Sequence, residues 1–161
     1  MTLERQVAVP NPDLTVLFVC TGNTCRSPIA EQIFNEQARG LSAHAFSAGL
    51  DAKSGSPINP QAANALTSLG YNPTGHSSTL LSTEEVEEAD VILTFTQDQK
   101  NELGQSFPTA IEKLFTISEY ANGDQGQDVL DPYGKSDEVY KDTAETIDSL
   151  VKVIVSSLKA S

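Results

Sequence analysis

Short apolar runs alternate with longer helical patterns along the chain. Residues 14–19 form an almost uninterrupted run rich in β-branched and aromatic side chains, which is typical of a central parallel strand covered on both faces. Weaker runs predict further strands at residues 43–47, 91–95 and 113–116. The pattern therefore predicts a sheet of about four strands.

Helical patterns lie between these strands. Ser27 followed by Pro28 predicts an N-cap and a first helical turn, and the apolar face that follows ends before Gly40. Residues 60–69 predict a second helix, which Gly70 ends.

Two further helices are predicted in the second half of the chain. Ser82 and Glu85 have the spacing of a capping box at the start of a short acidic helix. Ser136 opens a long final helix in which residues expected in the core recur every three or four positions: Val139, Thr143, Ile147, Leu150, Val151, Ile154 and Leu158.

This alternation predicts an α/β fold, a single-domain doubly wound sheet of about four parallel strands with helices on both faces. In such sheets the ligand site lies at the carboxyl ends of the strands. We expect the domain to cover residues 14–161. Residues 1–13 contain two prolines and no periodicity, which predicts a loosely held N-terminal arm.

Charge and hydropathy narrow the functional classes. Ten Lys and Arg against 22 Asp and Glu give a net charge of −12, which disfavours nucleic acid and anionic membrane as partners. No apolar stretch reaches the roughly 18 residues of a membrane span, and residues 1–13 hold no signal-peptide core. We expect a cytoplasmic protein, monomeric, without metal or cofactor.

The candidate chemistry lies between the first strand and the first helix. Cys20 and Cys25 are five residues apart, too close to build a disulfide framework, which indicates reactive thiols. Cys20 and Arg26 delimit a C-x5-R loop whose backbone N–H groups, with the helix start, can converge on a phosphate dianion. Gly22 and Asn23 tolerate the left-handed backbone that such a loop requires.

The same loop can activate a nucleophile. Its amides, the helix dipole and Arg26 stabilise a thiolate at Cys20, and the planar Arg26 fork can hold two phosphate oxygens. The alternative is a buried cysteine at a strand end followed by a plain turn. The strand before the loop and the helix signals after it favour the catalytic interpretation.

A second motif, Asp131-Pro132-Tyr133-Gly134, fixes a carboxyl group in a loop with proline and glycine. Attack by a cysteine on a phosphorylated side chain requires an acid for the leaving group. Taken alone, these four residues are more typical of an ordinary β-turn, and only their occurrence together with the Cys20 loop favours the catalytic interpretation.

The string CTGNTCRSP, together with Asp131-Pro132-Tyr133, resembles the low-molecular-weight protein tyrosine phosphatase family, and most closely its bacterial protein-arginine phosphatase branch. The resemblance extends from about Leu14 to the final helix. It includes three shorter stretches, Phe46-Ser47-Ala48-Gly49, Gly75-His76-Ser77 and Asp90-Val91-Ile92-Leu93.

The resemblance implies a flavodoxin-like fold and phosphorylated proteins as partners. It implies that Cys20 is the nucleophile, that Arg26 binds phosphate and that Asp131 is the general acid. The phosphate-binding loop would comprise Thr21, Gly22, Asn23, Thr24, Cys25 and Ser27. Within it Ser27 would hydrogen-bond the thiolate, while Asn23, Ser47 and His76 would hold the loop in shape.

Two residues bear on which phosphorylated side chain is cleaved. Thr24 stands where tyrosine-specific members of the family have an apolar residue, and a hydroxyl there can orient a polar guanidinium. Tyr133 would form an aromatic wall, which also suits phosphotyrosine. We therefore expect a phosphatase that slightly prefers phosphoarginine, with a phosphotyrosine phosphatase as the alternative.

Three points stay open. Cys25 is either a small core residue or the partner of Cys20 in a protective disulfide. Arsenate reductases share the fold but relay electrons through cysteines beyond the first loop, and none follows Cys25 here. A non-catalytic phosphate-binding module would have no use for the acid at Asp131.

Overall fold

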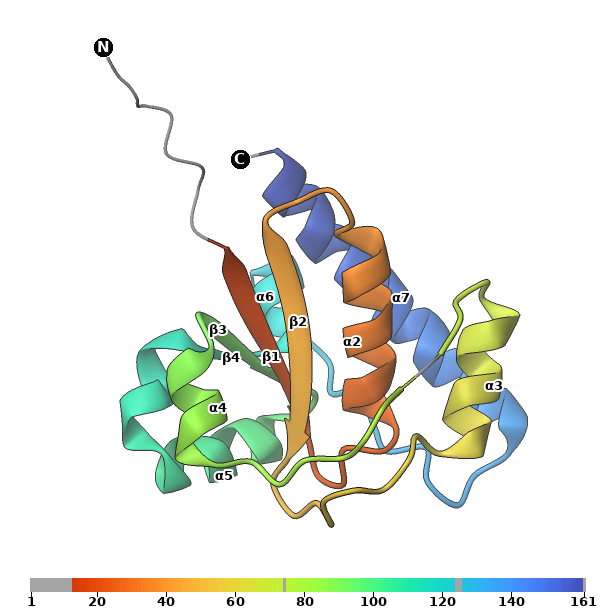
Figure 1. Cartoon of the computed structure of the whole chain (residues 1–161), viewed down its shortest axis with the longest axis horizontal. Coiled ribbons are helices and arrows are strands. Elements are labelled where there is room, and N and C mark those ends of the chain that lie inside the picture. The colour runs from red at the N-terminus through yellow and green to blue at the C-terminus, as the bar shows by residue number, and fades with distance from the viewer. Residues whose placement is uncertain (1–12, 74, 124–125, 161) are drawn as a thin grey trace.

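The computed structural model describes residues 13–73, 75–123 and 126–160. The predicted N-terminal arm, apart from Asp13, lies outside the described residues. A single parallel sheet has the strand order β2-β1-β3-β4 (Figure 1). Its strands are β1 (Leu14–Cys20), β2 (Ala43–Gly49), β3 (Val91–Thr94) and β4 (Leu114–Thr116). The predicted doubly wound α/β sheet is confirmed.

Helices cover both faces of the sheet (Figure 1). On one face lie α2 (Arg26–Gln37), α6 (Ile117–Asn122) and the long α7 (Asp137–Lys159), and α3 (Pro60–Ser68) packs against α7. On the other face lie α4 (Thr83–Glu88), α5 (Gln97–Ser106) and the 3-10 turn η1 (Pro108–Lys113).

The central strand β1 connects the two halves of the core. Its alternating side chains enter opposite layers, with Val16 and Phe18 facing α2 and α7, and Leu17 and Val19 facing α4 and α5. These four side chains are fully buried, so each contributes roughly 1.5–3 kcal/mol through the hydrophobic effect. The strand that carries Cys20 at its end is thereby held rigidly.

Two helix predictions were wrong in detail. Helix α2 begins at Arg26, and the Ser27 hydroxyl contacts the Cys20 sulfur and does not cap the helix. In α7, Val139 is 39% exposed, whereas Tyr140 and Ala144 fill the core, because the buried stripe is offset by one residue at the start of the helix.

The caps of the other predicted helices are confirmed. Glu85 accepts a hydrogen bond from the Ser82 backbone N–H, Ser136 caps α7, and Gly70 follows α3 with a left-handed backbone. Helices α5 and α6 were not predicted.

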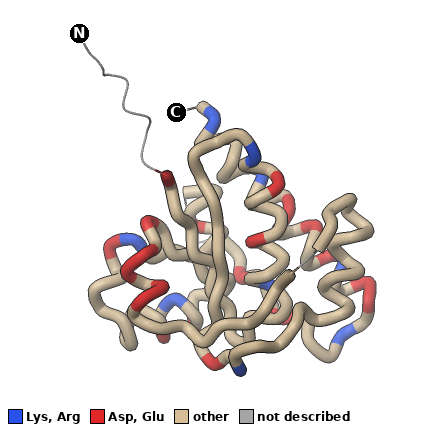
Figure 2. Tube along the Cα trace, in the orientation of Figure 1, with Lys and Arg blue, Asp and Glu red and all other residues tan. Residues whose placement is uncertain are grey.

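Acidic residues outnumber basic ones, and four glutamates lie on the short helix α4 (Figure 2). Among the described residues, no helix has both the length and the apolar character needed to cross a bilayer.

Candidate active site

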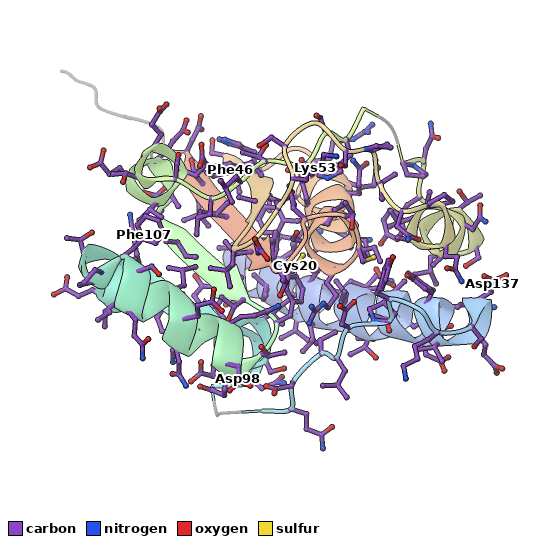
Figure 3. All side chains as sticks on the ribbon, turned by 90° about the horizontal axis from the view of Figure 1, so that it is seen from below. Cys20, Phe46, Lys53, Asp98, Phe107 and Asp137 are labelled. Carbon is purple, nitrogen blue, oxygen red and sulfur yellow. The ribbon has the colours of Figure 1, made fainter. Side chains whose placement is uncertain are left out.

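Cys20 is the last residue of β1, at the carboxyl end of the central strand (Figure 3). Its side chain is buried, and its sulfur lies 2.9 Å from Ser27 Oγ and accepts the Asn23 backbone N–H at 3.3 Å. If Cys20 is a thiolate, only Ser27 can be the donor in the first contact. The Ser27 hydroxyl and the Asn23 N–H thus both lie within hydrogen-bonding distance of the sulfur.

Asn23 organises the loop that follows. Its φ angle of 58° is left-handed, a conformation that asparagine tolerates better than most residues. Its side-chain amide donates to Ser27 Oγ (2.8 Å) and Ser47 Oγ (2.9 Å), while its side-chain oxygen accepts the Thr79 backbone N–H (2.8 Å). His76 Nε2 donates to the Asn23 carbonyl oxygen at 2.7 Å. The structure thus brings the three predicted support residues, Asn23, Ser47 and His76, together.

Several residues around this network were not singled out from the sequence. Glu31, on α2, accepts a 2.5 Å hydrogen bond from Ser47 Oγ, and Gln99 donates to Thr21 Oγ1 at 3.3 Å. At Gly49, an added Cβ would lie 2.6 Å from the Thr21 carbonyl oxygen. In the sequence, Gly49 was noted only as part of the stretch Phe46–Gly49. A close approach between segments that are distant in sequence produces no local pattern that would reveal it.

Arg26 lies in the first turn of α2 and is 4% exposed. Its Nη1 donates to the Val129 carbonyl oxygen (2.9 Å), and its Nη2 lies 3.8 Å from Asp131 Oδ2. Its buried Nε has no hydrogen-bond partner among the residues that the structure describes. An unpaired buried donor is costly, so this N–H favours an acceptor such as a phosphate oxygen.

Asp131 lies in the loop before α7, and its side chain is 53% exposed. Its Oδ1 accepts the Tyr133 backbone N–H at 3.0 Å, which aims the carboxyl group toward Arg26. Tyr133 itself is 71% exposed. The carboxyl group is therefore reachable both from solvent and from the cavity beside Cys20.

A cavity of about 220 Å³ joins the two motifs. Its lining consists of Cys20, Thr21, Gly22, Thr24, Cys25, Arg26, Asp131 and Tyr133. Of the other predicted site residues, Asn23, Ser27, Ser47 and His76 lie behind the lining and support it. Motifs more than 100 residues apart in sequence, joined by the bond from Arg26 to Val129, therefore share one site.

Cys25 forms part of the cavity wall as a free thiol, as does Cys20. Its sulfur lies 3.8 Å from the hydroxyl of Tyr140, a fully buried residue of α7. Burial raises the pKa of the Cys25 thiol, an effect that hydrogen bonds with Tyr140 and Thr24 partly offset. Cys25 is therefore predominantly protonated at neutral pH.

A family model described as "Low molecular weight phosphotyrosine protein phosphatase" matches residues 15–161. The chain belongs to this family. It is a protein phosphatase, a hydrolase that acts on phosphorylated side chains.

Relatives of this phosphatase carry two types of name. A "Protein-arginine-phosphatase" of Bacillus subtilis is 38% identical over 91% of this chain and 97% of its own length. The "Low molecular weight protein-tyrosine-phosphatase PtpB" of Staphylococcus aureus is 34% identical over 86% of this chain and 94% of its own.

Solved structures agree with the fold of this phosphatase. The YwlE arginine phosphatase from Geobacillus stearothermophilus superposes with a TM-score of 0.86 at 34% identity, covering 91% of this chain and 94% of that one. A second YwlE structure, a Cys-to-Ser mutant described as having a phosphorylated active-site serine, has a TM-score of 0.86 at 37% identity, covering 91% of this chain and 96% of that one.

Proposed function

We propose that the protein hydrolyses phosphorylated side chains of proteins through a phosphocysteine intermediate on Cys20, with phosphoarginine preferred. The observation that carries this proposal is the position of the Cys20 sulfur. It lies beneath a cavity that also receives Arg26 and Asp131, and it is held by hydrogen-bond donors from Ser27 and Asn23.

In the first step the Cys20 thiolate attacks phosphorus, and an S–P bond forms as the P–N bond of phosphoarginine, or the P–O bond of phosphotyrosine, breaks. The loop amides and the unpaired Nε–H of Arg26 are suited to hold the phosphoryl oxygens, whose negative charge they stabilise. Asp131 gives its proton to the leaving nitrogen or oxygen.

In the second step Asp131, now a carboxylate, accepts a proton from water as the water attacks phosphocysteine. The S–P bond breaks, and inorganic phosphate leaves. The Ser27 hydroxyl, 2.9 Å from the sulfur, stabilises the thiolate that is released. One carboxyl group thus serves both steps and is restored at the end.

The nucleophile can be identified directly. The YwlE mutant with a phosphorylated active-site serine supports a phosphorylated residue at the equivalent position. We expect Cys20→Ser to lose turnover but to become phosphorylated at that position by a phosphopeptide, as detected by mass spectrometry of the loop peptide. Cys25→Ser is the control, since it keeps the nucleophile. Retained turnover in Cys20→Ser would rule out the covalent mechanism.

The preference for phosphoarginine is proposed from Thr24. This residue is half-buried and lines the cavity, where its hydroxyl can pair with a guanidinium N–H that an aliphatic side chain would leave unpaired. Relatives named arginine phosphatases support it. The alternative, phosphotyrosine, is favoured by Tyr133, because an exposed aromatic ring beside Asp131 can pack against a phenyl group.

A side-by-side measurement of kcat/KM on phosphoarginine and phosphotyrosine peptides decides between them. We expect Thr24→Ile to lower kcat/KM on phosphoarginine peptides by roughly 5- to 150-fold, the cost of one unpaired polar group. The same variant should spare phosphotyrosine peptides. A ratio of the two constants that does not move would remove Thr24 as the selector and favour phosphotyrosine.

A further inference from the structure

A second, larger cavity lies beside the catalytic one. It measures about 680 Å³ and runs between α7 and the segment 127–131 that leads to Asp131. Asp131 lines both cavities, so the groove adjoins the cavity that holds Cys20. On the helix side its wall is formed by Val139, Thr143, Thr146 and Leu150, which lie one turn apart along α7.

Exposed apolar side chains lie on both walls of the groove. Leu130 is 72% exposed on the loop side, and Val139 is 39% exposed on the helix side. The sequence predicted Val139 in the core, yet it lines the groove. Two large apolar side chains on opposite walls of a cavity form a place for an apolar side chain of a ligand.

The groove is also acidic. Asp128 and Asp142 line it in addition to Asp131, whereas Lys135 is the only cationic residue among its described lining residues. The net charge of the whole chain, groove residues included, is −12. A ligand that carries a positive side chain is therefore favoured over an acidic one.

The length of the groove suits a short peptide. Val139 and Leu150 are 11 positions apart on α7, which corresponds to about 16 Å at 1.5 Å per residue. An extended chain rises about 3.3 Å per residue, so roughly five residues fit along the wall. A peptide segment of this length can extend directly from a phosphorylated residue that is held in the catalytic cavity.

We infer that this groove binds the residues on one side of the phosphorylated residue in the substrate protein. It selects an apolar side chain, seated between Leu130 and Val139, and a basic side chain that faces Asp128 and Asp142. This inference rests on the proposed function, since it assigns a peptide-recognition surface to the same reaction.

The test compares a small substrate with peptides. The small substrate is a chromogenic aryl phosphate that fills only the catalytic cavity. The peptides carry the phosphorylated residue next to a five-residue flank that contains leucine and lysine, placed on either its N-terminal or its C-terminal side. Matched peptides carry glycine and glutamate in the flank.

Two variants change the groove, Asp142→Lys and Val139→Lys. Two matched controls, Glu145→Lys and Val153→Lys, change exposed residues of α7 that do not line it. For one of the two leucine–lysine peptides, the one whose flank enters the groove, we expect each groove variant to lower kcat/KM by roughly 5- to 30-fold. The loss should come mainly from a higher KM, and thermal stability should be retained. The controls and all rates on the aryl phosphate should change less than about twofold.

The possible outcomes separate the groove from the reaction. Equal losses in groove variants and controls, or no preference of the unaltered protein for the leucine–lysine flank, would overturn the groove while leaving the phosphatase intact. Absence of turnover on the aryl phosphate and on every peptide would overturn the proposed function itself.

Discussion

The hydrogen bond from Asn23 to Ser27 determines how the Ser27 hydroxyl can be used. Ser27 Oγ accepts the Asn23 side-chain amide and lies 2.9 Å from the Cys20 sulfur, so its proton remains available for donation to a thiolate there. The orientation of the Asn23 amide is in turn fixed by the Thr79 backbone N–H, which must face an oxygen. A chain of hydrogen bonds therefore ends at the sulfur that, as we propose, attacks phosphorus.

Asp131→Asn tests the general acid at the level of one residue. The amide cannot donate a carboxylic proton, so we expect phosphocysteine formation to slow by on the order of 10²-fold on substrates with poor leaving groups. Substrates with good leaving groups need less protonation and should lose less. Single-turnover rates on a series of aryl phosphates would measure this dependence. An equal loss across the series would show that Asp131 only positions the loop.

Cys25 provides a prediction with a defined pH dependence. Peroxide oxidises the Cys20 thiolate to a sulfenic acid, which the Cys25 thiolate can then attack to form a disulfide and release water. Because burial raises the pKa of Cys25, its thiolate fraction is small at neutral pH and grows as the pH rises. We expect disulfide formation to accelerate with pH, as followed by mass spectrometry of quenched samples.

The Cys25→Ser variant completes this experiment. Without a resolving thiol, the sulfenic acid at Cys20 proceeds to sulfinic acid, so peroxide should inactivate the variant irreversibly. The unaltered protein should recover with added thiol. Identical recovery in both would reject the protective role of Cys25.

Among the elements, β2 ends in a close backbone contact with the cysteine loop. Gly49 is the last residue of β2, the strand that carries Ser47, and its backbone approaches Thr21 and Asn23 too closely for a side chain. We expect Gly49→Ala to displace the loop, reduce kcat at least tenfold and destabilise the fold by about 1–3 kcal/mol. Urea unfolding and steady-state kinetics would measure both effects.

Gly104→Ala is the matched control for that variant. Gly104 lies within α5, and an added Cβ would make ordinary contacts at 3.6 Å with Leu114 and 3.7 Å with Ile111. Alanine is the better helix former, so stability should stay equal or rise by up to about 1 kcal/mol. A comparable loss in both variants would mean that the position of Gly49 is not special.

The elements also show how far sequence patterns reach. The buried strands and the capped helices were predicted because apolar runs and caps are local signals. Helix α5 was missed since its sequence is polar almost throughout, with Leu103 its only large apolar residue in the core. Glu31 and Thr79 were missed for a different reason, because only the folded chain brings them to the loop.

At the scale of the whole molecule, the net charge of −12 opposes the approach of an anionic substrate. Salt screens this repulsion beyond about 10 Å at 0.1 M ionic strength. We expect kcat/KM on an acidic phosphopeptide to rise by roughly 2- to 10-fold as a chloride salt is added at constant pH. Stopped assays at several ionic strengths would measure this dependence. A kcat/KM that falls as salt is added would contradict the expectation.

The bond from Arg26 to Val129 and the contact of Cys25 with Tyr140 have a consequence for biosynthesis. A ribosome makes the cysteine loop long before it makes the residues that hold the guanidinium and fill the space beneath the thiol. Contacts of such sequence separation form late in folding, because long loops must close first. We therefore expect the nascent chain to lack activity until α7 has been synthesised and has docked.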